Sequence, residues 1–345
     1  TILIEDIENK RFSLINFYQR RARRILPALF AVITTCIPFA WLWMTPRQIE
    51  EFSQSLIAVI FFSSNLLFWR QSGYFESGAE EQPLLHTWSL SVEEQYYVLF
   101  PIFLLIFWRL GTTKIFWIIV LLAVSSLILS EWGWRNSPKA NFYLAPTRAW
   151  EILAGSMVAF LIWGKKVQDN NTLSFIGLVL IILAIFVYDE STPFPSVYTV
   201  LPVAGVTLVL LYAGQKTLVE KLLSAKVFVG LGLISYSAYL WHFPILAFAR
   251  IKFDETPTRF LTSMFLVLSL VLAIFSWKFI EQPFRKFPVG GIGKKSFVLA
   301  LLTIICLTLV AGVIGSRYYE YNEFANKGQK AIMAYERYER KLVYR

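Results

Sequence analysis

Four arginines within five positions are the first residues whose type and spacing could do chemistry. Arg20, Arg21, Arg23 and Arg24 directly precede an apolar run. On a helix Arg21 and Arg24 share one face, and Arg20 and Arg23 share another. Two guanidinium groups on one face suit a di- or triphosphate, because each forks onto phosphate oxygens. The alternative is an anchor for anionic lipid headgroups, at about 1 kcal/mol per base.

A second group, within residues 84–101, combines His86 with Glu93 and Glu94 beside an apolar run. Ser91 and Glu94 have the spacing of a capping box, which predicts that a helix starts here with both carboxylates at its positive end. A carboxylate pair beside a histidine at a membrane surface is a candidate for acid–base catalysis. The alternative is that Glu94 only caps, Glu93 only faces water and His86 is structural.

Two pairs of opposite charge lie at the ends of apolar runs. Arg148 and Glu151 flank Trp150 at a spacing of three residues. They are either a surface ion pair worth about 0.2–0.5 kcal/mol or, if they face the interior, a positioned pair near a substrate. Glu281 and Arg285 are four residues apart and form either a helix terminus or a gate contact.

A fourth group places Ser235, Tyr236, Tyr239 and His242 inside one apolar stretch. The two tyrosines and the histidine recur every three residues, so they form one stripe on a helix. Aromatic packing explains the tyrosines better than it explains His242. Pro244 predicts a kink or an unwound turn that opens backbone groups to the site.

Membrane helices must position these residues. The chain has 345 residues, of which 56% are apolar and 16% charged, against about 45–50% and 25% in soluble domains. This composition excludes a soluble globular enzyme and a disordered chain. The two cysteines lie in apolar runs, so we expect no disulfide framework and no metal. The net charge of +10 would indicate nucleic acid in a soluble protein, but the bases lie between apolar runs, so membrane lipid is the expected partner and nucleic acid is not.

We therefore expect an all-α polytopic bundle of about nine spans, with residues 55–69 as a re-entrant or interfacial helix. The expected spans lie in the apolar runs 26–44, 93–108, 115–130, 149–163, 173–188, 197–213, 228–249, 260–280 and 297–315. One set of linkers holds 17 Lys and Arg residues against 8 on the opposite side, which assigns that set to the cytoplasm. These linkers are 10–24, 109–114, 164–172, 214–226 and 281–296. Ten crossings are the alternative, which would invert the charge bias downstream.

This organisation divides the chain into three parts: a basic cytoplasmic lead-in (1–25), a membrane domain (26–315) and a polar external stub (316–345).

The four groups, in this order, resemble the integral-membrane acyltransferase family 3. These are O-acetyltransferases that modify O-antigen, peptidoglycan-like and other surface glycans. The resemblance covers about residues 12–290. It rests on the segments FYQRRARRILPAL, SGYFESGAEEQPLLHTWSLSVEEQYYVLFP, FYLAPTRAWEILAG, GLISYSAYLWHFPI and IEQPFRKF.

The resemblance implies roles for particular residues. The family's R-x-x-R pair falls on Arg21 and Arg24. Together with Arg20 they would bind the donor acyl-CoA, in the simplest case acetyl-CoA. His86, Glu93 and Glu94 become candidate catalytic residues. The candidate substrate-binding residues are Arg148, Trp150, Glu151, Ser235, Tyr236, Tyr239 and His242.

The resemblance also implies a function. A multi-pass protein of the bacterial inner membrane would move an acyl group from cytoplasmic acyl-CoA to a hydroxyl of a cell-surface glycan, such as lipopolysaccharide, or of a lipid-linked sugar. Relatives begin with two earlier spans that carry the principal histidine, so we expect that base outside this chain. Many continue into an external SGNH-type domain. The alternatives are a transporter or flippase of a polar or lipid-linked solute, and an inactive fragment.

Overall fold

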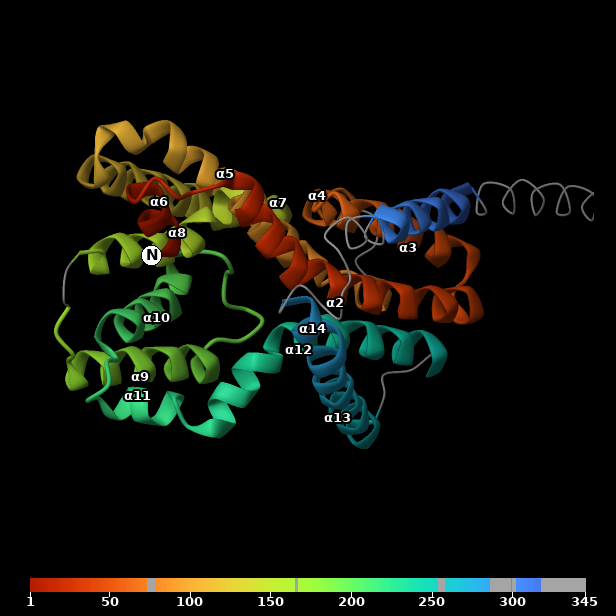
Figure 1. Cartoon of the computed structure of the whole chain (residues 1–345). Coiled ribbons are helices and arrows are strands. Elements are labelled where there is room, and N and C mark those ends of the chain that lie inside the picture. Colours follow the sequence, from red (N-terminus) through yellow and green to blue (C-terminus); the bar gives the residue numbers. More distant parts are fainter. Residues whose placement is uncertain (73–77, 165–166, 254–257, 286–298, 300–301, 318–345) are drawn as a thin grey trace, which may run out of the picture. The chain divides into compact units, whose positions relative to one another are not determined.

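The computed structural model describes residues 1–72, 78–164, 167–253, 258–285, 299 and 302–317, and every regular element in these ranges is helical (Figure 1). Five helices are long and apolar enough to cross a membrane, judged by length and composition. They are Leu14–Trp43, Thr87–Leu110, Thr112–Asn136, Lys226–Phe253 and Arg259–Arg285. The all-α polytopic architecture is thus confirmed, whereas the count of nine spans stays a prediction.

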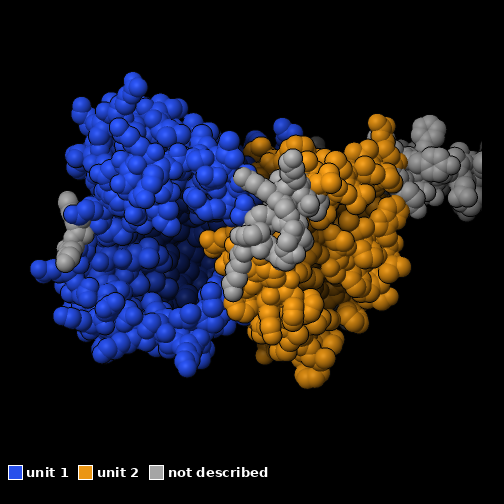
Figure 2. All heavy atoms as spheres, in the orientation of Figure 1, with its two compact units in different colours: residues 1–23, 68–74, 88–236 blue, residues 24–67, 75–87, 237–345 orange. Residues whose placement is uncertain are grey.

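The helices form two compact units, coloured separately in Figure 2. Unit 1 contains residues 1–23, 68–74 and 88–236, and unit 2 contains residues 24–67, 75–87 and 237–345. Four of the described helices contribute residues to both units, and they are α2 (Leu14–Trp43), α4 (Ser64–Gln71), α5 (Thr87–Phe107) and α12 (Lys226–Phe253).

Unit 1 is built mainly from α5 to α11 together with the first helix of the chain. Its elements include α1 (Ile2–Glu8), η2 (Trp108–Leu110), α6 (Thr112–Asn136), α7 (Pro138–Tyr143), α8 (Ala145–Ile162), α9 (Asn171–Val187), η3 (Val197–Thr199), α10 (Val200–Tyr212) and α11 (Leu218–Leu223). Its core joins Ile4 and Ile7 of α1 with apolar side chains of α5, α6 and α8. Helices α9 and α10 approach closely because both carry glycine at the contact. A Cβ on Gly177 would lie 2.7 Å from the carbonyl oxygen of Gly205, the small-residue packing typical of membrane helices.

Unit 2 joins the rest of α2 and α12 to helices from both ends of the sequence. Its other elements are α3 (Pro46–Ile60), the first half of α4, η1 (Ala79–Glu81), α13 (Arg259–Ser276), a π-helical segment (Trp277–Glu281), α14 (Gln282–Arg285) and the helix Leu302–Arg317. This last helix packs on α3 through glycines. A Cβ on Gly312 would lie 2.8 Å from the Ile57 side chain.

The expected single helix over 55–69 is wrong. The chain forms α3 and α4 instead, and the break between them falls at residues 61–63. A capping box starts α3, in which the Thr45 side chain accepts from Gln48 N and Pro46 takes the first helical position. With 15 and 8 residues, each helix is shorter than the about 20 residues that a crossing needs.

Two local predictions are also wrong. Helix α5 begins at Thr87, so Ser91 lies inside it and does not cap it. Helix α12 continues through Pro244, so the helix is not unwound there; a proline in a membrane helix is tolerated where neighbouring groups take up the freed backbone carbonyl.

The three-part division of the chain stays a prediction, with two observations bearing on it. Because α2 begins at Leu14, the boundary proposed after residue 25 falls inside a continuous helix. Of the stub 316–345, only Ser316 and Arg317 lie within the described residues, and most of the linker 281–296 lies outside them.

Candidate functional site

Arg21 of α2 forms an ion pair with Glu94 of α5 inside unit 1. Arg21 Nη2 lies 2.9 Å from Glu94 Oε1, and its Nε lies 3.2 Å from the same oxygen. The guanidinium carbon also lies 3.0 Å from the ring centroid of Tyr97. Two side chains 73 residues apart in sequence, one a predicted donor ligand and the other a predicted catalytic residue, therefore belong to one group.

A pocket of about 270 Å³ opens beside this pair, between α1, α2, α5 and α8. Arg21 and Tyr97 line it, as do Tyr96 and Ser156, which are hydrogen-bonded to each other. Most of the remaining lining is apolar and includes Phe100. The pocket thus places one cation at the wall of a largely apolar space.

The other predicted residues of the first two groups lie in more open positions. Arg20 makes only a long ion pair to Asp6, at 3.7 Å, and its side chain is 57% exposed. Arg24 is exposed and belongs to unit 2. Glu93 is exposed whereas Glu94 is buried, because consecutive residues on a helix point about 100° apart. The two carboxylates therefore point in different directions, and their predicted catalytic role stays a prediction.

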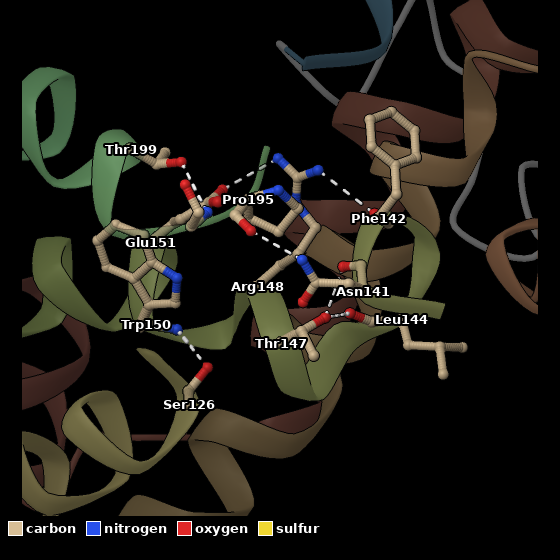
Figure 3. Close-up of polar contacts among 11 residues, drawn as sticks. Ser126, Asn141, Phe142, Leu144, Thr147, Arg148, Trp150, Glu151, Pro195 and Thr199 are labelled. Carbon is tan, nitrogen blue, oxygen red and sulfur yellow. Dashed lines mark hydrogen bonds and ion pairs between the residues drawn. The ribbon is translucent and has the colours of Figure 1, made fainter. Parts of the chain in front are cut away.

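Arg148 is buried in unit 1 among aromatic side chains, which we call the aromatic cage, and Figure 3 shows its polar contacts to Glu151 and Phe142. Its Nη2 lies 3.1 Å from Glu151 Oε2, and both residues are on α8. The guanidinium carbon lies 4.8 Å from the ring centroid of Trp88 and 4.7 Å from that of Phe194, with Phe142 further away at 5.7 Å. Of the two interpretations of this pair, burial favours the inward-facing one.

Polar contacts between backbone and side chains hold the cage in place (Figure 3). Asn141 Nδ2 donates to the carbonyl of Pro195 at 2.7 Å, which ties α7 to the loop that carries Phe194. Thr147 Oγ1 donates to the Asn141 carbonyl at 2.7 Å, at the start of α8. Ser126 of α6 accepts from Trp150 N at 3.1 Å. Trp150 itself lies in the unit 1 core, so its role here is packing.

The chain's two histidines lie together in unit 2. The ring centroids of His86 and His242 are 5.8 Å apart, although 156 positions separate them in sequence. Phe243 stacks on His86 at 5.5 Å, and the ring of Tyr239 lies 5.1 Å from it. The Tyr239 hydroxyl donates to the His86 carbonyl. We call these four residues the histidine cluster.

The contacts of His242 define which ring nitrogen holds the proton in its neutral form. His242 Nδ1 lies 2.8 Å from the carbonyl oxygen of Tyr239 and 3.3 Å from that of Ala238. A carbonyl oxygen only accepts, so Nδ1 carries the hydrogen and Nε2 keeps its lone pair. The half-buried His242 is thus arranged to accept a proton at Nε2.

His86 is held neutral in the same cluster. It precedes α5 and is only 6% exposed. Burial lowers the pKa of His86 to about 3, with a smaller lowering from His242. At physiological pH this imidazole therefore carries no charge.

Ser235 and Tyr236 do not join the histidine cluster. Ser235 is exposed and donates to Gly232 O on its own helix, and Tyr236 belongs to unit 1. Sequence reasoning missed Ser237, which is fully buried and donates to Glu281 Oε2 at 2.9 Å. Glu281 is itself fully buried and is paired with Arg285. The spacing of Glu281 and Arg285 was the one signal for this network.

The helices define a multi-pass membrane protein whose charged and aromatic side chains gather in a few buried groups. The sequence matches the acyltransferase domain family over residues 7–280, and the chain belongs to that family.

Two curated relatives illustrate the match. The chain is 29% identical over 299 residues to the peptidoglycan O-acetyltransferase OatA of Listeria monocytogenes. This alignment covers 81% of the chain and 47% of the relative. It is 26% identical over 334 residues to the O-acetyltransferase OatA of Staphylococcus aureus. This alignment covers 91% of the chain and 55% of the relative. The chain thus spans about half the length of the curated relatives it matches. No solved structure matches the chain.

Proposed function

We propose that this protein is an O-acyltransferase of the bacterial plasma membrane. It would move an acyl group, in the simplest case acetyl, from cytoplasmic acyl-CoA to a hydroxyl of a cell-envelope glycan or lipid-linked sugar. Family membership supports the reaction class. The names of both relatives support acetyl as the group, and the name of the Listeria relative supports a glycan as the acceptor.

The observation that carries the proposal is the position of Arg21 at the wall of the unit 1 pocket. A coenzyme A thioester combines phosphates with a long, slender arm. A guanidinium beside a largely apolar space suits both parts, because it forks onto phosphate oxygens while the apolar walls bury the arm. Glu94 and Tyr97 contact the guanidinium and hold it in place.

Within unit 2, His242 of the histidine cluster is a second candidate for the group that accepts the proton of the acceptor hydroxyl, beside the histidine that the resemblance places outside this chain. His242→Gln should lower kcat by about 10²–10⁴-fold. Activity within tenfold of the unaltered protein would assign the base to a group outside this cluster.

The donor assignment is tested with the full-length protein in inverted membrane vesicles, by following transfer of label from acetyl-CoA to alkali-labile ester. Arg21→Ala should raise the KM for acetyl-CoA by about 10–100-fold, the value of charge-assisted hydrogen bonds to phosphate. Arg109→Ala removes an exposed arginine outside the pocket and should leave the KM unchanged.

A second variant separates donor binding from a purely structural role of Arg21. In Arg21→Ala combined with Glu94→Gln, the buried carboxylate is neutralised together with its partner. If Arg21 only balances Glu94, the double variant recovers the original KM, and the donor assignment is refuted. If Arg21 binds the donor, the KM stays high. Label transfer that never requires acyl-CoA, or solute uptake without ester formation, would favour a transporter instead.

A further inference from the structure

Unit 2 contains a second pocket, of about 510 Å³, that the proposed chemistry does not use. One face of α12 forms its longest wall, with residues recurring at helical spacing. These residues are Trp241, Pro244, Ile245, Phe248, Ala249 and Lys252. The other walls come from α2 and α13.

The pocket is apolar along its length and charged at one end. The walls from α2 and α13 include Phe39, Trp43 and Leu268, and Lys252 is the one charged residue in the lining. Lys252 is exposed in the last turn of α12, and its Nζ lies 5.7 Å from the ring centroid of Trp43. At 1.5 Å per residue, Trp241 and Lys252 are about 16 Å apart along the helix.

Among the described residues, the basic side chains at this end of α12 differ in their partners. Its neighbour Arg250 is paired with Glu80 at 3.0 Å. No carboxylate within the described ranges forms an ion pair with Lys252. A lysine and a tryptophan together at the ends of two membrane helices, α12 and α2, are typical of the interface with lipid headgroups.

We propose that this pocket binds one hydrocarbon chain of an anionic phospholipid, whose phosphate binds Lys252. The hydrocarbon chain of the lipid extends from the end of α12 toward Trp241. Its contacts with bulk lipid are replaced by contacts with the aromatic and aliphatic side chains that line the pocket. The volume of the pocket lies within the range of ligand pockets, about 300–1,000 Å³. The site goes beyond the proposed acyl transfer and does not depend on it.

Native mass spectrometry of the full-length protein tests the site. The protein, purified in neutral detergent, is mixed with equal amounts of phosphatidylglycerol and phosphatidylcholine that carry identical chains. The unaltered protein should retain phosphatidylglycerol about fivefold more strongly, the effect of one base on an anionic lipid. Lys252→Gln should abolish this preference. Lys226→Gln, at the exposed opposite end of the same helix, should leave it intact.

A pocket-filling variant tests the hydrocarbon part. Ala249→Trp should reduce retention of both lipids, and its folding is checked by its size-exclusion profile. If this variant does not fold, the comparison of Lys252→Gln with Lys226→Gln still tests the proposal. Equal retention of both lipids by the unaltered protein would overturn the proposal, as would an unchanged preference in Lys252→Gln. Free glycerol phosphate should not compete. Full competition would identify a site for soluble phosphate and refute the lipid assignment.

Discussion

The aromatic cage around Arg148 makes an asymmetric prediction about an ion pair. In an ion pair with no other contacts, removing either partner lowers the free energy of unfolding by a similar amount. Here the guanidinium also lies over Trp88 and Phe194, and only the carboxylate depends on the pair alone. Arg148→Ala should therefore destabilise the protein far more than Glu151→Gln.

The magnitudes follow from burial and geometry. Leaving a buried carboxylate without its guanidinium costs about 3–5 kcal/mol, and the 19% exposure of the Glu151 side chain favours the lower end. Each close cation–π contact adds about 0.5–1 kcal/mol. Arg148→Ala should thus cost about 4–5 kcal/mol. Glu151→Gln keeps an oxygen to accept from Arg148 and leaves the cation in its cage, so it should cost about 1–2 kcal/mol.

Reversible unfolding in mixed micelles measures both free energies of unfolding. Arg135→Ala is the matched control, because Arg135 makes an exposed ion pair with Glu131 and is 52% exposed; its loss should cost less than about 1 kcal/mol. Equal costs for Arg148→Ala and Glu151→Gln would refute the asymmetry and with it the cage as the source of stability.

Three further predictions concern other parts of the chain. Because the pKa of His86 is lowered to about 3 in the folded protein, the folded protein binds a proton there less readily than the unfolded chain does. The free energy of unfolding should therefore fall as the pH drops below about 6.5. In His86→Gln this part of the pH profile should be flatter. Ser237→Ala should cost about 1–3 kcal/mol, because it removes a hydrogen bond to the fully buried Glu281; limited proteolysis that shows no change would contradict this. Gly177→Ala places a Cβ 2.7 Å from the backbone of α10 and should lower the melting temperature, whereas Gly230→Ala meets open space and should not.

Local sequence patterns predicted individual helices well and their ends less well. The apolar run 115–130 lies within α6, and the run 228–249 within α12, because a helix that satisfies its own backbone is what a long apolar run must form in a membrane. Capping signals were less reliable. The Ser91–Glu94 spacing fits a capping box, yet the helix starts at Thr87, and Glu94 pairs with an arginine from another helix.

The sequence by itself determined the helical membrane architecture and the family. Composition and the order of the motifs are enough to predict the architecture and the family, because both are features of the linear sequence and require no knowledge of tertiary contacts. Tertiary structure alone decided the partnerships: Arg21 with Glu94, His86 with His242, and Ser237 with Glu281. Each depends on how one helix is rotated against another. That rotation results from many weak side-chain contacts between distant segments, which no local spacing records.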